Sequence, residues 1–151
     1  TLSLHDALPI SGYGLGSSRE DEKPAFCFGH GLSYTSYEYS GLKIDSVIPQ
    51  TQDIEFTFTV KNTGNMAGKE TALVFIRDCV SSVVTPVACL KGFEKVSLNP
   101  GESKDIRIVI PYSDLGLWNE DMKYVVESGK FNLIIGRSVE DIRIKKDFFI
   151  K

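Results

Sequence analysis

Apolar residues recur at every second position through most of this chain. In residues 53–61 four of them, Ile54, Phe56, Phe58 and Val60, alternate with polar residues. Because successive side chains of an extended strand point to opposite faces, a period of two places all four on one face. The pattern predicts a strand with one face in a core and the other toward water.

Similar runs divide the rest of the chain into seven or eight short strands separated by turn residues such as Asn99-Pro100-Gly101. Residues 72–76 are continuously apolar, which predicts a central strand covered on both faces. Gly92 predicts a bulge or a close backbone approach, and residues 112–118 fit either a helical turn or a short strand. The predicted strands are 37–47, 53–61, 69–79, 87–98, 105–110, 124–126, 131–135 and 142–150.

Short strands with regular turn signals and no amphipathic helix predict an all-β fold of two antiparallel sheets packed face to face. We expect an immunoglobulin-like or fibronectin type III-like sandwich of seven to eight strands over residues 37–151, with an irregular N-terminal leader. A closed barrel is the alternative. The chain has 151 residues, of which 42% are hydrophobic, and this is sufficient for the core of one such domain.

The first 36 residues have a different character. Residues 1–11 show no pattern that links them to the rest, and we interpret them as foreign sequence from a join between gene fragments. Residues 12–23 combine three glycines with a charge cluster, which predicts a mobile linker. Residues 24–36 contain two aromatic residues and a Gly-His-Gly turn, which predict a hinge that docks onto a neighbouring surface. The docking residues are expected to be Phe26, Phe28, Gly29, His30, Gly31, Leu32 and Tyr34.

Composition excludes several classes of partner. A net charge of −3 with acids and bases interspersed gives no basic face for nucleic acid. No apolar run reaches the roughly 18 residues that cross a bilayer, so no membrane partner is expected. The three cysteines lack Cys-x-x-Cys spacing, and no metal site is predicted. Free thiols in a reducing, cytoplasmic compartment are the simpler interpretation, with a Cys79–Cys89 disulfide as the alternative.

Candidate chemistry is equally sparse. The acids fall in turns or on outward faces, and His30 is the only histidine outside residues 1–23. No Gly-x-Ser-x-Gly surrounds a serine, and the glycines at 12, 14 and 16 lack the strand and helix of a dinucleotide site. We therefore predict no catalytic residue and no cofactor. The single tryptophan, Trp118, is a candidate sugar contact, although a core or rim tryptophan is common in a sandwich.

Four sequence blocks together resemble one family. They are Phe-Gly-His-Gly-Leu-Ser-Tyr-Thr (28–35), Val-Lys-Asn-Thr-Gly (60–64) with Ala-Gly-Lys-Glu (67–70), Leu-Lys-Gly-Phe-Glu-Lys-Val (90–96) with Pro-Gly-Glu-Ser (100–103), and Gly-Arg-Ser-Val-Glu-Asp-Ile-Arg (136–143). This order is similar to that of the C-terminal fibronectin type III-like domain of glycoside hydrolase family 3 β-glucosidases. The resemblance implies that the nucleophilic aspartate and the acid/base glutamate lie in upstream domains outside this chain.

Two functions of different classes follow. The first is a non-catalytic accessory domain that packs against, and stabilises, the catalytic domains of its own polypeptide, through which it meets carbohydrate. The alternative is a free-standing carbohydrate-binding module with Trp118 and surface tyrosines as its platform. An adhesion-type interaction module fits the fold but not the four blocks.

Overall fold

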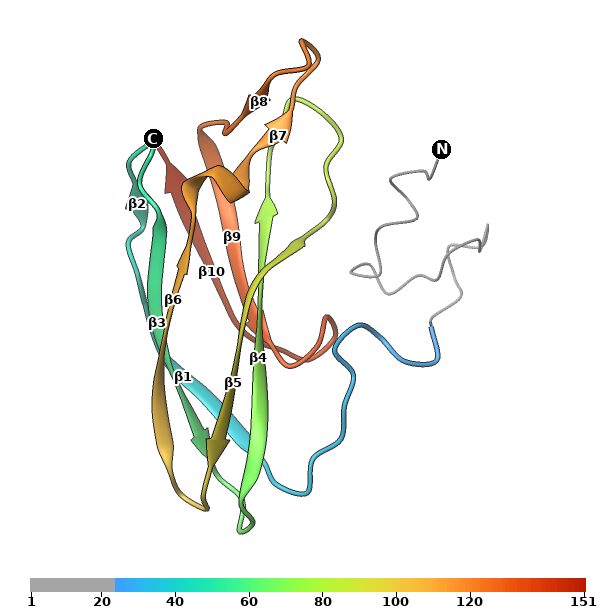
Figure 1. The fold of residues 1–151 in the computed structure, drawn as a ribbon, viewed down its shortest axis with the longest axis vertical. Helices are drawn as coiled ribbons and strands as arrows, with labels where there is room; N and C mark the ends of the chain where they lie inside the picture. Colours follow the sequence, from blue (N-terminus) through green and yellow to red (C-terminus); the bar gives the residue numbers. More distant parts are fainter. Residues whose placement is uncertain (1–23) are drawn as a thin grey trace.

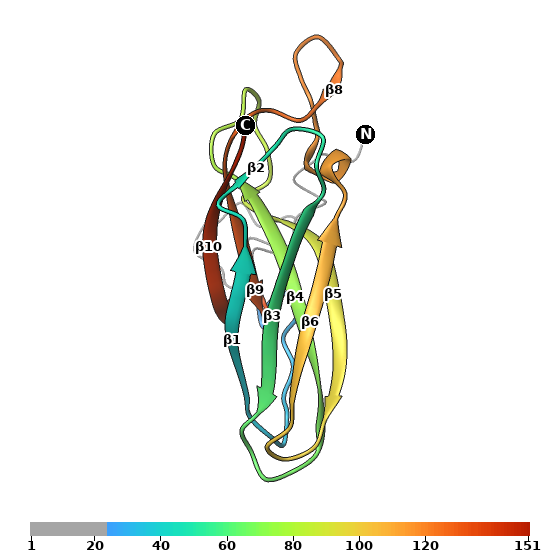
Figure 2. The same cartoon turned by 90° about the vertical axis from the view of Figure 1, so that its left-hand side faces the viewer.

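The computed structural model describes residues 24–151, which form two packed β-sheets (Figure 1). The expected leader and linker, residues 1–23, lie outside the described residues. One sheet has the strand order β1-β3-β6 and the other the order β2-β10-β9-β4-β5. In Figure 2 the three-stranded sheet faces the viewer and the five-stranded sheet lies behind it. The predicted all-β sandwich is confirmed in place of the barrel.

Seven strands are long and three are short within residues 24–151. The long strands pair antiparallel, and short β2 pairs parallel with β10. A 3-10 helix, Tyr112–Leu115, lies between β6 and β7. The strands are β1 (Tyr37–Ile44), β2 (Val47–Ile48), β3 (Ile54–Asn62), β4 (Gly68–Asp78), β5 (Cys89–Leu98), β6 (Ser103–Ile110), β7 (Leu117–Trp118), β8 (Tyr124–Val125), β9 (Gly129–Gly136) and β10 (Ile142–Ile150).

The core lies between the sheets and follows the alternation. In β3 all four alternating apolar side chains are buried, with exposed fractions of 1% or less. Burying a large apolar side chain contributes about 1.5–3 kcal/mol relative to leaving it exposed, so a shift of one residue in register would be costly. The largest fully buried side chains are Phe56, Phe58, Phe131, Phe148, Ile54, Leu98, Ile110, Leu133, Ile135, Ile150, Val60 and Val74.

The structure tests three local predictions, with different outcomes. The predicted strand 37–47 is divided, because Gly41 takes a φ of 66° at a register shift and the chain then crosses to the other sheet as β2. At Gly92 the expected bulge is present, since the pairing with β4 shifts beside it. Residues 112–118 hold both candidates, a 3-10 helix followed by the two-residue strand β7.

Strand β4 is covered on both faces, as its continuous apolar run predicts. Val74 and its alternate neighbours enter the core between the sheets. Leu73 and Phe75 point to the outer face of the five-stranded sheet and form a second apolar cluster there. Phe28, from the segment before β1, packs against this second cluster. The chain that leads into the sandwich therefore covers part of the outer face.

Candidate functional site

The segment 24–36, which we call the strap, is held on the outer face by a few contacts. The Phe28 ring meets the Phe75 ring edge-on with centroids 6.2 Å apart, and the Val139 amide donates to the Phe28 carbonyl at 3.1 Å. Gly29 has a φ of 81°, and a Cβ there would lie 2.6 Å from Leu73 Cδ1. The position therefore needs glycine both for its backbone conformation and for the close approach. Figure 1 shows the strap, in blue, along this side of the sandwich.

Three large side chains of the strap are exposed to solvent. Leu32 and Tyr34 are each 94% exposed and Phe26 is 73% exposed, with its ring beside that of His30. A Cβ at Gly31 would meet nothing within 4 Å. The seven residues expected to dock thus divide into an inner pair, Phe28 and Gly29, and an outer set that presents large apolar side chains to solvent.

Beneath the strap lies a buried ionic network. Glu70 is 3% exposed, and its Oε1 accepts a hydrogen bond from Tyr39 Oη at 2.9 Å and forms an ion pair with Arg137 Nε at 2.9 Å. Arg137 also approaches Asp141 at 3.8 Å, and Asp141 pairs with Arg143 at 2.6 Å. Burial raises the pKa of the Glu70 carboxyl, while Tyr39 and Arg137 oppose that shift. Sequence analysis missed this network because its members lie far apart in the chain.

A second buried network fixes the turn between β3 and β4. Asn62 has no exposed surface, and its Oδ1 accepts from Thr35 Oγ1 at 2.7 Å and from the Gly64 amide at 3.0 Å. Its Nδ2 donates to the carbonyls of Met66 at 2.8 Å and Leu98 at 3.1 Å. One side chain thus joins the end of the strap, the β3–β4 turn and the end of β5.

Neither network is arranged for hydrolysis. Glu70 is the only buried carboxylate among residues 24–151, and its charge is already paired with a cation. A hydrolytic pair needs two carboxyl groups that face a substrate across a cleft, with one of them free to donate a proton. The described part of the chain also holds no group of three or more side chains suited to a metal ion.

Other sequence candidates can now be placed. All three cysteines are free thiols in the structure, with Cys27 buried and Cys79 and Cys89 half-buried. Asp141, one of the acids expected in turns or on outward faces, keeps 40% of its side chain exposed and also pairs with Arg143. No helix within residues 24–151 has the length and apolar character that a membrane span needs.

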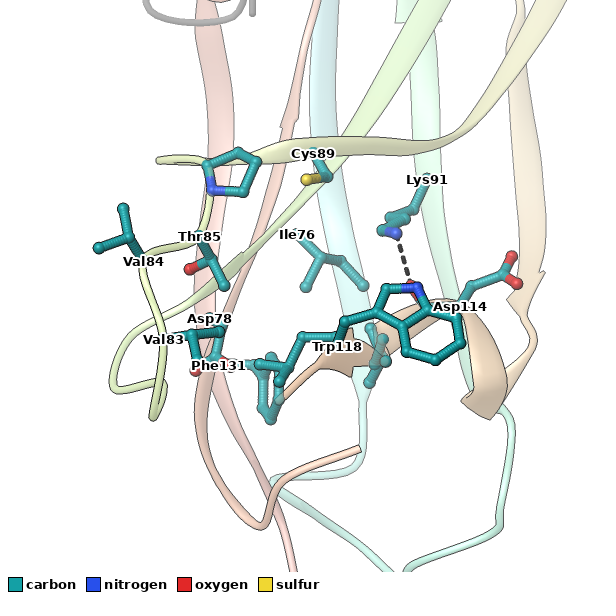
Figure 3. A pocket seen from close by; sticks show the side chains of 14 residues that line it. Ile76, Asp78, Val83, Val84, Thr85, Cys89, Lys91, Asp114, Trp118 and Phe131 are labelled. Atoms are coloured by element: carbon teal, nitrogen blue, oxygen red, sulfur yellow. Dashed lines mark hydrogen bonds between the residues drawn. The ribbon is translucent and has the colours of Figure 1, made fainter. Parts of the chain in front are cut away.

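Trp118 lies at the end of the sandwich, on the wall of a cavity of about 390 Å³ (Figure 3). In Figure 3 the indole stands on one side, Val83, Val84 and Thr85 stand on the other, and Ile76 and Cys89 lie between them. We call this space the end cavity. Its lining residues are Ile76, Asp78, Val83, Val84, Thr85, Pro86, Cys89, Lys91, Asp114, Leu115, Gly116, Leu117, Trp118 and Phe131.

Comparison with known proteins agrees with this fold. Residues 70–139 match the family model described as "Fibronectin type III-like domain". The chain is 44% identical over 126 residues to thermostable β-glucosidase B of Acetivibrio thermocellus, covering 82% of this chain and 17% of that protein. It is 38% identical over 151 residues to a putative β-xylosidase of Formosa agariphila, covering 99% of this chain and 20% of the relative.

Solved structures of β-glucosidases also match this fold over part of their length. A β-glucosidase from Listeria innocua, crystallised with glucose, superposes with a TM-score of 0.82 at 29% identity, over 89% of this chain and 19% of that one. β-Glucosidase 3B from Thermotoga neapolitana superposes with a TM-score of 0.78 at 36% identity, over 84% of this chain and 17% of the other. This chain therefore spans about a fifth of the proteins that it matches.

Fold and matches together define the class as a fibronectin type III-like β-sandwich. The family expected from the four sequence blocks is confirmed: this chain is the fibronectin type III-like domain of a glycoside hydrolase family 3 protein, similar to the domains in β-glucosidases and β-xylosidases.

Proposed function

We propose that this domain is a non-catalytic C-terminal accessory domain that packs, through the outer side of its strap, against the catalytic domains of a β-glucosidase-like polypeptide. The observation that carries the proposal is the near-complete exposure of Leu32 and Tyr34, 94% each, on a segment that is attached to the sheet through Phe28. Large apolar side chains grouped on one surface usually mark an interaction site. Because the chain spans only about a fifth of its relatives, the remaining domains supply a natural partner.

The contacts between the strap and the sandwich would hold the docking surface in a fixed position. Phe28 and Gly29 fix the strap to the outer face of the five-stranded sheet, and Thr35 fixes its other end to Asn62. A strap that is held at both ends presents its outer side chains in a fixed position, which lowers the entropy lost on docking. In this proposal the strap stabilises the catalytic domains by offering them a rigid surface.

The isolated chain is expected to hydrolyse no aryl-β-glucoside, because the one buried carboxylate among residues 24–151, Glu70, is already paired with Arg137. The measurement is the release of nitrophenol from nitrophenyl β-glucoside and from nitrophenyl β-xyloside by highly purified protein. Turnover that copurifies with the chain and disappears on substitution of one of its own acids would show that the domain is catalytic.

Docking can be tested in a chimera. The matched residues of the Acetivibrio thermocellus relative are replaced by those of this chain, and thermal inactivation of β-glucosidase activity is followed. We expect Leu32→Ser with Tyr34→Ser to shorten the half-life at least severalfold, because two apolar contacts of about 1.5–3 kcal/mol each would be lost from the interface. Met122→Ser is the matched control, since Met122 is 76% exposed at the tip of the β7–β8 hairpin.

Each result of the chimera experiment bears on the proposal. Faster inactivation of the strap variant alone supports docking through Leu32 and Tyr34. Equal half-lives for the strap variant and the unchanged chimera would exclude these side chains from the interface. A Met122→Ser chimera whose half-life falls as much as that of the strap variant would exclude them as well. An unchanged chimera without activity also counts against the proposal, because a domain 44% identical to the one it replaces should fit the same surface.

A further inference from the structure

We propose that the end cavity is a binding site for a neutral saccharide, one ring of which stacks on Trp118. Docking through the strap does not require such a site, and the cavity lies on different elements: the end of β4, the 79–88 loop, the start of β5 and residues 114–118. Its volume of about 390 Å³ lies within the range of about 300–1,000 Å³ that is typical of small-molecule sites.

Trp118 is exposed and yet held in place. It is 61% exposed, and the Tyr124 ring contacts it edge-on with centroids 5.4 Å apart. Tyr124 is itself fixed, because its hydroxyl donates to the Ser113 carbonyl at 2.9 Å and its ring packs where a side chain at Gly116 would lie. One edge contact leaves indole surface free for a flat ligand. A pre-positioned aromatic surface binds at low entropic cost, which suits a platform better than a filler of the core.

The turn beyond Trp118 is equally ordered. Asn119 Oδ1 accepts from the amides of Asp121 and Lys123, at 3.1 and 2.9 Å, and the Asn119 amide donates to the Lys123 carbonyl at 3.0 Å. These bonds close the β7–β8 hairpin although it has only two residues in each strand. The hairpin therefore holds the indole at the rim of the cavity.

The opposite wall is fixed independently. Ser81 Oγ donates to the Val83 carbonyl at 2.6 Å, and the Ser81 and Thr85 hydroxyls lie 3.1 Å apart. The Ser82 amide and hydroxyl both donate to the Glu127 carboxylate. Two walls that are each held by their own hydrogen bonds make the end cavity a preformed space between them.

The lining favours a neutral polyhydroxyl ligand. Lys91 lies beside the indole in Figure 3 and donates to the Asp114 carbonyl, and an ammonium group has three protons to donate. Asp78 and Asp114 are both among the lining residues, and desolvation raises the pKa of Asp78. One cation with two acids gives no surplus positive charge for an anionic ligand. An aromatic face combined with hydrogen-bonding groups of both kinds suits the apolar face and the hydroxyl rim of a pyranose.

The test uses the whole 151-residue chain, whose only tryptophan is Trp118. Cellotetraose and xylotetraose are titrated to tens of millimolar while tryptophan fluorescence is followed, and the affinity is measured in parallel by calorimetry. This choice of sugars rests on the proposed relation to β-glucosidases and β-xylosidases. We expect a saturable change in fluorescence with at least one of the two sugars.

Three variants locate the site by calorimetry. Trp118→Ala is expected to weaken binding about tenfold, the effect of an aromatic contact of about 1.4 kcal/mol. Lys91→Met should weaken it by a smaller factor through loss of a hydrogen-bond donor. Phe93→Ala is the matched control, because Phe93 is an exposed aromatic residue, 66% exposed on β5, that does not line the cavity. It should leave the affinity unchanged.

The absence of saturation with both sugars would overturn the proposal, as would binding that Trp118→Ala leaves intact. Binding of an uncharged aromatic probe such as naphthol, with no binding of either sugar, would show an apolar site and also overturn it. These outcomes are independent of the chimera experiment, which measures docking through the strap. A failure of one inference therefore leaves the other standing.

Discussion

Replacing Arg137 with methionine is expected to lower the free energy of unfolding by about 3 kcal/mol at pH 7, because it leaves the Glu70 carboxylate buried without its cation. Arg137 is itself about a quarter exposed, which places the effect at the lower end of the range for broken buried pairs. Methionine keeps most of the aliphatic volume, so the loss reports on charge more than on packing. Urea unfolding of the isolated chain gives the measurement.

The pH dependence of this variant separates charge from shape. Burial already raises the pKa of Glu70 in the folded protein, and loss of Arg137 removes a group that opposes that shift. A carboxyl whose folded pKa is raised binds more protons in the folded state than in the unfolded state, so stability falls as the pH rises between the two pKa values. The deficit of Arg137→Met should therefore shrink as the pH is lowered from 7 toward the unfolded pKa of glutamate, about 4.3.

Arg107→Met is the matched control. Arg107 forms a two-bond pair with Glu55, at 2.6 and 2.7 Å, but both side chains are more than half exposed. Exposed pairs contribute little to stability because water solvates the separated charges nearly as well. A midpoint close to that of the unchanged chain is expected. An Arg137→Met deficit that stays constant with pH, or that Arg107→Met reproduces, would contradict the role assigned to the buried pair.

The fold was predictable because its main signal is local. Each buried apolar side chain of β3 could be assigned from its neighbours two residues away, and the continuous run in β4 correctly indicated a strand covered on both faces. The division of the first predicted strand into β1 and β2 was not predictable in this way. It depends on which strand β2 pairs with, namely β10 at the far end of the chain.

The site was less predictable because it too depends on contacts between segments that are far apart in the chain. The four sequence blocks that identified the family turned out to contain Glu70, Arg137 and Asn62, each of which has a partner far away in the chain. Nothing near Glu70 in the sequence distinguishes it from a solvated acid. The strap residues were selected together, yet the structure turns Phe28 inward and Leu32 outward. Burial and contact, which decide these roles, arise only when distant segments meet.

Asn62→Ala is expected to lower the free energy of unfolding by about 3 kcal/mol. The change removes four hydrogen bonds in a position without solvent access, and it leaves groups such as the Leu98 carbonyl without this donor. A buried polar group that loses its partner costs about 1–3 kcal/mol, and more than one such group is affected. The measurement is urea unfolding at pH 7, with the slope of the transition used to check that the folded state is still compact.

The same substitution should also release the strap, since Thr35 loses its acceptor on Asn62. Limited proteolysis is then expected to cut within residues 30–36 faster than in the unchanged chain, beyond what global destabilisation produces. Asn65→Ala, an exposed position in the same turn, supplies the control and should change neither stability nor cleavage. Equal cleavage rates in Asn62→Ala and in a core variant of matched stability, such as Ile106→Val with a second apolar truncation, would show that Asn62 supports the sandwich but does not hold the strap.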